Sequence, residues 1–163
     1  MGDDVLSLDL GTKIGWSVNG MDGYTHKLSS TDDKFDEFDT FLEIHIENGI
    51  TTIAYEAAAF QPGAAIPIYH GLVGVLKSAA KRNNVKLIPI SVGTIKKIFT
   101  GKARYSTIEL REFEKELGLK PKKSPNTKAP TLAMCKKLGY VYDGEDGADS
   151  LSVHYAYRKL YGN

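Results

Sequence analysis

The sequence predicts an α/β fold built on one mixed five-stranded sheet, with three antiparallel strands followed by parallel strands and with helices on both faces. Three strand-like segments lie within the first 28 residues, and Asn19-Gly20, between the second and the third, is a strong hairpin signal. Helix-like and strand-like segments then alternate, which is typical of parallel strands joined by helices. The length of 163 residues and the hydrophobic content of 42% suffice for one domain, residues 1–163, with a real core.

The first half of the chain supplies four of the predicted strands and one helix. The strands are expected at Val5–Asp9, Gly15–Val18, Tyr24–Leu28 and Thr51–Glu56. Apolar residues recur at helical spacing from Phe35 to Ile46, which predicts a helix over about residues 33–48. Thr31 or Asp32 can cap the start of this helix, and Gly49 can end it.

The second half adds helices around one further strand. Ser106 and Glu109 form a capping-box pattern, and Pro67 is compatible with the first turn of a helix. The Lys- and Pro-rich segment 119–127 is expected to be an exposed loop. The strand is expected at Lys86–Ile90, a short helix or turn at 92–99, and helices at about 65–83, 107–117, 128–138 and 147–160.

Charge is distributed unevenly, although the net charge is only +1. Residues 1–60 hold twelve acidic and three basic residues, a net charge of −9. Residues 94–128 hold ten basic and four acidic residues, a net charge of +6. Such a basic stretch can contact a polyanion such as nucleic acid, but it is equally typical of an ordinary solvated helix.

Several features bear on the cellular location. No apolar stretch is long enough to span a bilayer, so no membrane partner is expected. The acidic start, Asp3-Asp4, is unlike secretory and mitochondrial targeting peptides. The single cysteine, Cys135, cannot form an internal disulfide and is most simply a core residue. These features indicate a cytoplasmic protein.

Four carboxylates carry most of the chemical information. Asp9 and Glu56 each end an apolar strand, and Asp146 and Asp149 lie three residues apart at the start of the last helix. Buried carboxylates are costly unless a cation offsets their charge, and Mg²⁺ prefers such oxygen ligands. Two such ions about 4 Å apart are the usual apparatus for phosphodiester hydrolysis. The four acids together therefore predict a metal-dependent nuclease.

Each acid taken alone has an ordinary interpretation. Asp9 could be a turn residue that leaves a strand, and Glu56 could be an exposed strand-edge residue. Asp146 and Asp149 could simply complement the dipole at a helix N-terminus. Glu145 and Asp143 could take their place if the helix register differs.

Short motifs along nearly the whole chain resemble those of one family. They are Asp9-Leu10-Gly11-Thr12 with Gly15-Trp16-Ser17, Glu56 with Phe60 in the next loop, and Asp146-Gly147-Ala148-Asp149-Ser150-Leu151. In this order they resemble RuvC-type Holliday-junction resolvases of the ribonuclease-H-like superfamily, which occur in bacteria and their phages. The resemblance implies a ribonuclease-H-like sheet and a cytoplasmic enzyme of DNA recombination and repair, in a bacterial or phage-infected cell.

The resemblance further implies a homodimer that nicks two strands of like polarity across a four-way DNA junction, with two Mg²⁺ or Mn²⁺ ions per active site. Asp9, Glu56, Asp146 and Asp149 match the family's acidic tetrad, in which Asp9 would bridge both ions. Lys128 resembles a basic residue at the start of the penultimate helix and could stabilise the transition state. The helix at 65–83 is expected to be either the dimer surface or an ordinary core helix.

DNA contacts are expected from one aromatic residue and a set of basic residues. Phe60 resembles the aromatic residue that wedges into the junction centre, although it could instead anchor its loop on the core. Lys96 resembles a basic residue just after the fifth strand. The chain departs from the family's pattern at about residues 101–128, which look like a basic insertion. The residues expected to hold the DNA backbone are Lys96, Lys97, Lys102, Arg104, Lys122 and Lys123.

Three other functions remain open at this point. A less selective flap or branched-DNA nuclease would use the same site. The Asp9-Leu10-Gly11-Thr12 segment also resembles the phosphate-binding loop of actin-like ATPases, but those proteins need two lobes around a nucleotide. A structural DNA binder is disfavoured, because four clustered acids would repel phosphate.

Overall fold

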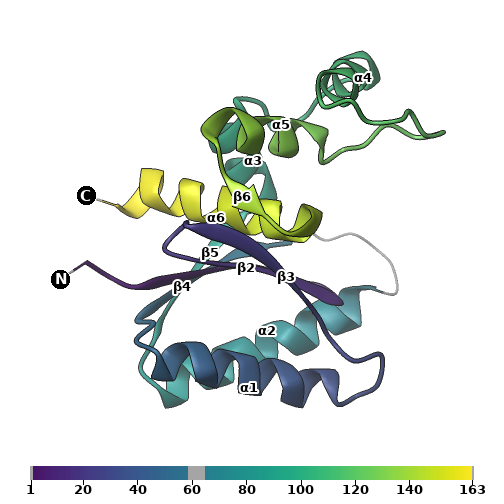
Figure 1. The fold of residues 1–163 in the computed structure, drawn as a ribbon. Helices are drawn as coiled ribbons and strands as arrows, with labels where there is room; N and C mark the ends of the chain where they lie inside the picture. Colours follow the sequence, from purple (N-terminus) through teal and green to yellow (C-terminus); the bar gives the residue numbers. More distant parts are fainter. Residues whose placement is uncertain (1, 59–64, 163) are drawn as a thin grey trace.

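The computed structural model describes residues 2–58 and 65–162, which form a mixed sheet with helices on both faces (Figure 1). The strands are β1 (Val5–Asp9), β2 (Lys13–Val18), β3 (Asp22–Lys27), β4 (Thr52–Ala57), β5 (Lys86–Ser91) and β6 (Val141–Tyr142). Their order across the sheet is β5-β4-β1-β2-β3-β6. The strands β1, β2 and β3 pair antiparallel, whereas β4 pairs parallel with both β1 and β5.

The predicted α/β fold and its five strands are confirmed, but the prediction of a five-stranded sheet is incomplete. A sixth strand, β6, pairs parallel with β3 through Asp22 opposite Val141 and Gly23 opposite Tyr142. It has only two residues, which is too short for an alternating pattern to be recognised in the sequence. The additional strand extends the sheet beyond β3, and it directly precedes the last helix in the sequence.

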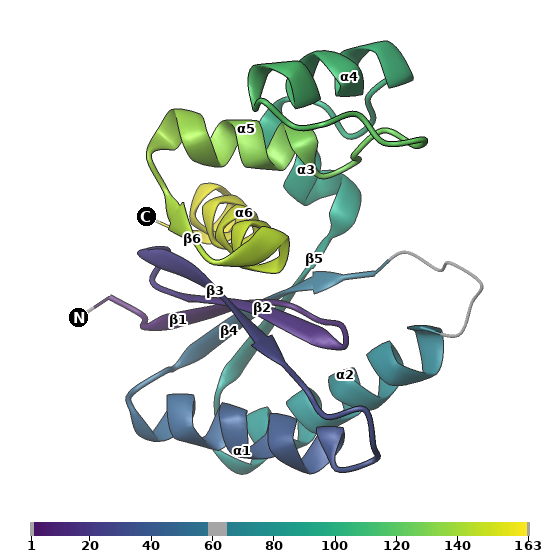
Figure 2. The same cartoon turned by 45° about the vertical axis from the view of Figure 1, so that its right-hand side comes forward.

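Two helices cover one face of the sheet, and the others lie beyond the opposite face (Figures 1 and 2). On the first face lie α1 (Lys34–Glu47) and α2 (Ala65–Arg82). On the opposite face α6 (Gly144–Tyr161) crosses the central strands. The remaining helices are α3 (Val92–Thr100), α4 (Thr107–Glu116) and α5 (Ala129–Leu138), of which α4 lies farthest from the sheet.

Strand alternation decides which side chains meet each helical layer. Successive residues of a strand point to opposite faces. Leu6 and Leu8 of β1 therefore join the core beneath α1 and α2, whereas Val5 joins the core beneath α6. Ser7 also lies on the α6 side, where its hydroxyl contacts His154. Asp9 follows Val5 and Ser7 at the same spacing of two residues, so the alternation of the strand directs its carboxylate toward α6.

The last helix begins earlier than the sequence pattern predicts. It starts at Gly144, after the N-cap residue Asp143, rather than at about residue 147. Its first turn lies directly on the sheet: a Cβ atom at Gly15 would be 1.9 Å from the carbonyl oxygen of Asp146, and one at Gly23 would be 2.2 Å from that of Gly147. Only glycine permits this contact, which fixes the start of α6 against β2 and β3.

Within the described residues, none of the helices combines the length and the hydropathy that a membrane span requires. Cys135 is buried beside Phe99, Leu132 and Leu151, as expected for a core residue.

Candidate active site

Three of the four predicted acids converge where β1 ends and α6 begins. Asp9, Asp146 and Asp149 each offer a carboxylate oxygen, and these oxygens all lie within 4.8 Å of one another. Asp146 and Asp149 come from successive turns of α6, so a spacing of three places both on the same helix face. The close contact of this helix with Gly15 brings that face to the end of β1.

Glu56 borders this cluster from the neighbouring strand. The parallel pair aligns Leu8 with Tyr55, so the next residues along β1 and β4 are Asp9 and Glu56, at the same edge of the sheet. The pKa of Glu56 is raised to about 7, mainly by burial and also by the charge of Asp149, while the charges of Lys96 and Lys128 act to lower it. Glu56 therefore interacts electrostatically with Asp149 and Asp9, while it lies outside the group of three aspartates whose oxygens converge.

Asp9 and Asp149 are held in an environment that disfavours their charge. Burial raises the pKa of Asp9 well above its usual range, and the charges of Asp149, Glu56 and Asp146 add to that effect. Burial also raises the pKa of Asp149, against the opposing charge of Lys128. The ionised forms of Asp9 and Asp149 are therefore costly in this site, and a bound divalent cation would offset that cost. An all-oxygen donor set of this kind fits Mg²⁺ or Mn²⁺.

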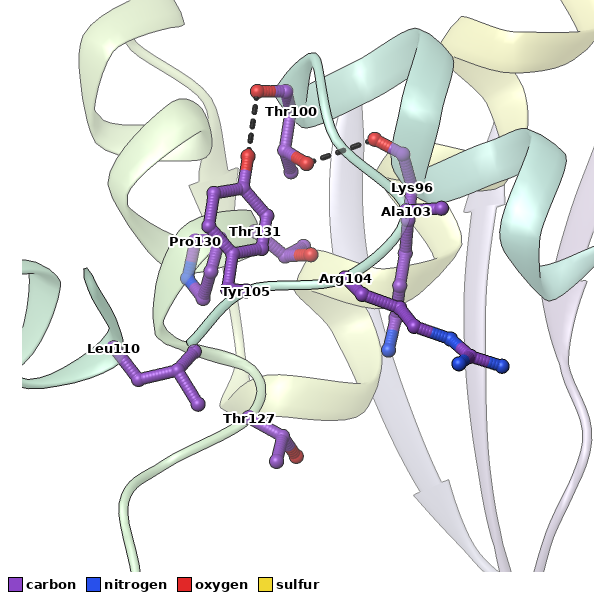
Figure 3. A pocket seen from close by; sticks show the side chains of 9 residues that line it. All are labelled: Lys96, Thr100, Ala103, Arg104, Tyr105, Leu110, Thr127, Pro130 and Thr131. Atoms are coloured by element: carbon purple, nitrogen blue, oxygen red, sulfur yellow. Dashed lines mark hydrogen bonds between the residues drawn. The ribbon is translucent and has the colours of Figure 1, made fainter. Parts of the chain in front are cut away.

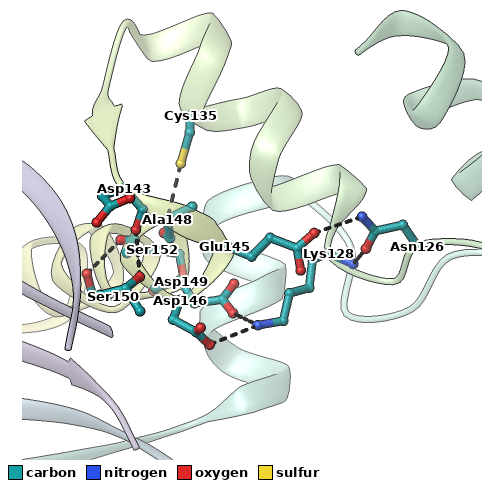
Figure 4. Close-up of polar contacts among 12 residues, drawn as sticks. Asn126, Lys128, Cys135, Asp143, Glu145, Asp146, Ala148, Asp149, Ser150 and Ser152 are labelled. Carbon is teal, nitrogen blue, oxygen red and sulfur yellow. Dashed lines mark hydrogen bonds and ion pairs between the residues drawn. The ribbon is translucent and has the colours of Figure 1, made fainter. Parts of the chain in front are cut away.

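Lys128 is the cation that the fold places against the acids (Figure 4). Its Nζ atom lies 2.6 Å from Oδ2 of Asp149 and 3.4 Å from Oδ1 of Asp146. Burial alone would lower the pKa of Lys128, but the charges of Asp149, Asp9 and Asp146 and the hydrogen bond to Asp149 raise it above its usual value. Lys128 therefore stays protonated, and it occupies the N-cap of α5.

Two residues that the sequence did not single out hold the backbone at Lys128. The amide N–H of Lys128 donates to Oδ1 of Asn126 at 2.9 Å. Asn126 in turn donates its own N–H to Oε1 of Glu114 at 2.6 Å and its Nδ2 to Oε1 of Glu145 at 3.2 Å. Glu114 is only 4% exposed and also accepts a hydrogen bond from Arg111. These contacts connect α4 with the start of α5 and of α6.

The signal for Glu114 and Asn126 was weak in the sequence. An Arg and a Glu three residues apart on a helix are usually a solvated pair, and Asn near proline is usually a turn residue. Their connection to Lys128 depends on the tertiary fold. Glu145 contacts Asn126, and Asp143 is the exposed N-cap of α6, so neither joins the three aspartates whose oxygens converge.

The predicted DNA-contact residues occupy different environments. Lys96 is partly buried on α3, where its charge lowers the pKa of Glu56, and Lys97 on the same helix is exposed. Lys102 pairs with Glu109, and Arg104 is exposed. Phe60 lies outside the described residues. Lys122 and Lys123 are exposed in the loop before α5, and their carbonyl oxygens accept hydrogen bonds from Arg111 at 2.7 and 3.3 Å.

Comparison of the structure with solved structures gives a full-length match at low sequence identity. RuvC of T. thermophilus, in complex with a Holliday junction substrate, aligns with a TM-score of 0.66 and 16% identity over 99% of this chain and 96% of that chain. A second Thermus thermophilus RuvC structure aligns with a TM-score of 0.60 and 16% identity over 96% and 95% of the two chains. The sequence matches no protein-family model and no curated protein. The chain therefore has the ribonuclease-H-like fold of RuvC Holliday-junction resolvase structures.

Proposed function

We propose that this chain is a metal-dependent, structure-selective endodeoxyribonuclease that resolves four-way DNA junctions by paired symmetric nicks. The observation that carries the proposal is the convergence of Asp9, Asp146 and Asp149, with Glu56 at their side, in a RuvC fold. The aligned RuvC structure contains a Holliday junction substrate, which supports branched DNA as the substrate here. A role in recombination or repair follows from that substrate.

Asp9, Glu56, Asp146 and Asp149 would hold two divalent ions, with Mg²⁺ or Mn²⁺ suited to their oxygens. Bound ions of this kind supply a hydroxide at neutral pH and stabilise a departing oxygen. Asp9 is the acid most strongly influenced by the others, because Asp149, Glu56 and Asp146 all act on it. It is therefore the residue we propose to be shared by both ions.

Lys128 would contribute positive charge from a partly buried position. Its ammonium group lies within ion-pair distance of two acids, so a phosphodiester bound at those acids would also lie beside it. A fixed charge in a partly buried site stabilises developing negative charge better than an exposed lysine does. Lys128 is therefore proposed as a catalytic residue that stabilises the phosphorane.

The DNA backbone would follow the basic side of the molecule. Lys97, Arg104, Lys122 and Lys123 are exposed, and Lys96 lies beside the acid cluster. These residues belong to α3 and to the segment 101–128, which we propose to be a basic insertion that enlarges the DNA-binding surface of a single domain. Such contacts would fix the orientation of DNA without reading its sequence.

A homodimer is part of the proposal, because symmetric nicks need two active sites. The inner face of α2 is core, with Leu72, Leu76 and Ala79 fully buried, so the helix is not available as a whole. Its other face exposes Gly74, where an added Cβ would meet nothing within 4 Å. We propose that outer face of α2 as the dimer surface. Separately, we propose Phe60 as the aromatic residue that wedges into the centre of the DNA junction. Measuring the molecular mass of the protein in solution tests whether it forms a dimer.

A less selective flap or branched-DNA nuclease would share this chemistry, so the test must vary DNA geometry. The wild-type protein is incubated with labelled four-way junction, flap, duplex and single-stranded DNA, with Mg²⁺ and with EDTA. We expect paired nicks only in the four-way junction, and only when Mg²⁺ is present. Equal cutting of flap and junction would favour the broader nuclease, and binding of ATP at low micromolar concentration without cleavage would favour an ATPase.

A further inference from the structure

A pocket of about 250 Å³ lies between α3, α4 and the start of α5 (Figure 3). Lys96 and Arg104 lie on one side of it, and Leu110 and Pro130 lie on the other. The remaining lining includes the ring of Tyr105 and the hydroxyl groups of threonines that follow the exposed loop. Cations on one side and apolar or aromatic groups on the other suit a ligand that joins an anion to a flat ring.

Two lining residues of the pocket connect it with the proposed active site. Lys96 acts electrostatically on Glu56, and Thr127, another lining residue, directly precedes Lys128. Lys128 in turn pairs with Asp149 at 2.6 Å. A DNA strand with one phosphate at the acids would therefore have a neighbouring nucleotide at the mouth of this pocket.

The ring in the pocket is held rigidly. The hydroxyl group of Tyr105 donates to the carbonyl oxygen of Thr100 at 2.8 Å, and its ring packs edge-to-face on Phe113 with 5.3 Å between centroids. Thr100 is itself anchored, because its hydroxyl group donates to the carbonyl oxygen of Lys96 at 2.8 Å. A pocket whose walls are already ordered loses little conformational entropy when a ligand enters.

Size limits what can enter. A volume of about 250 Å³ is small for a drug-sized ligand and cannot admit a base pair, but it can hold one heterocyclic base. A base can enter only if it is unpaired, as enzymes that extrude a nucleotide into a side pocket require. A base of a four-way junction would therefore have to leave its pair before it enters the pocket.

We propose that this pocket receives one unpaired nucleotide of the strand whose phosphodiester lies at the acid cluster, with its phosphate at Lys96 and Arg104 and its base beside Tyr105, Leu110 and Pro130. This inference rests on the proposed function. It assigns to the segment 101–128 a role beyond backbone attraction, since Arg104, Tyr105 and Leu110 all belong to it. The nucleotide at this position would influence which phosphodiester is cut.

The test combines a pocket-filling variant with base removal. Ala103 lines the pocket and is exposed, so Ala103→Trp fills the space without disturbing the core. Ile108→Trp is the matched control, because Ile108 is 73% exposed on α4 and lies outside the pocket. Both changes are made in Asp9→Asn protein, so that the DNA stays intact. Junctions carrying one abasic site at successive positions around the crossover are then bound, with affinity measured by fluorescence anisotropy.

In Asp9→Asn protein, one abasic position is expected to weaken binding by about tenfold, as loss of a stacked base does. Ala103→Trp should bind the intact junction as weakly as the abasic one and should no longer distinguish the position, whereas Ile108→Trp should still distinguish it. If no abasic position matters, or if Ala103→Trp behaves like Ile108→Trp, the pocket proposal is overturned while junction cleavage by wild-type protein still stands. If wild-type protein neither binds nor cuts the junction, the proposed function fails, and the pocket proposal falls with it.

Discussion

The acid cluster and the surroundings of His154 are two buried polar regions made by the same two elements, β1 and α6. In one, Ser7 lies 3.3 Å from Nδ1 of His154, and burial together with Arg158 lowers the pKa of this histidine to about 4. In the other, Asp9 faces Asp146 and Asp149, and burial together with neighbouring negative charges raises the pKa values of Asp9 and Asp149. The first region is neutral and hydrogen-bonded, whereas in the second region like charges lie close together without full compensation.

This difference indicates which region serves structure and which serves function. A buried neutral pair with a hydrogen bond satisfies its polar atoms and supports packing. Buried like charges lower stability, and they persist where another partner compensates them. Ser7 of the neutral region and Asp9 of the charged region are only two residues apart on β1, and both are directed to the α6 side.

The largest expected effect is on cleavage by Asp9→Asn. This change removes the proposed shared metal ligand, and because loss of a residue that only supports a ligand already costs about 10–100-fold, cleavage of a four-way junction should fall by at least about 100-fold. Binding to the junction should be kept or improved, because one repulsive charge is gone. Normal cleavage by this variant, measured with labelled junction in Mg²⁺, would remove Asp9 from the mechanism.

A smaller loss is expected when the support of Lys128 is removed. Asn126→Ala deletes the acceptor of the Lys128 amide and the link to Glu145, so kcat should fall by about tenfold with little change in KM. The control is Asn83→Ala, which removes a hydrogen-bonded asparagine that contacts Glu43 on the opposite side of the sheet. Equal kcat values for the two variants would show that Asn126 does not position Lys128.

Stability should depend on pH in opposite directions in the two regions. Glu56 has a folded pKa of about 7, above its ordinary value of 4.5, so its contribution is present below pH 4.5 and is lost as pH rises through 7. His154 has a folded pKa of about 4, below 6.5, so its contribution is present above pH 6.5 and is lost as pH falls through 4. In EDTA, Tm should therefore be highest near pH 5–6.

Divalent metal should change only the alkaline side of that profile. Thermal unfolding is followed across pH 4–9 with EDTA and with Mg²⁺, and Mg²⁺ is expected to raise Tm by several degrees at pH 8 and hardly at pH 5. An equal increase at both values of pH would contradict the assignment of the acids as the metal site.

The smallest effect concerns the basic loop. Lys122→Ala combined with Lys123→Ala should weaken junction binding most at low salt and should reduce the slope of log affinity against log salt by about 2. Lys136→Ala with Lys137→Ala is the control, since this exposed pair lies in the last turn of α5, at the end opposite Lys128. An unchanged slope for the loop variant would show that this loop does not contact phosphate.

The parts of this fold that follow local patterns were predictable from the sequence. Asp9 and Glu56 end apolar strands, and the expected strand order brings those ends together, as the parallel pairing of β1 and β4 shows. The two residues of β6 and the early start of α6 were not predictable, because both depend on tertiary contact with β3. The connection of Glu114 to Lys128 through Asn126 was missed because it also depends on tertiary contact. Asn126 lies twelve positions after Glu114 in the sequence.

The central claim is that acids distant in the sequence form one cation site, and direct counting of bound Mn²⁺ by electron paramagnetic resonance tests it. Wild-type protein is expected to bind two ions, and Asp9→Asn, Asp146→Asn and Asp149→Asn should each lose binding. The neighbouring acids provide controls, since Glu145→Gln and Asp143→Asn should bind Mn²⁺ as wild-type protein does. Equal Mn²⁺ binding by wild-type protein and Asp9→Asn would contradict the claim.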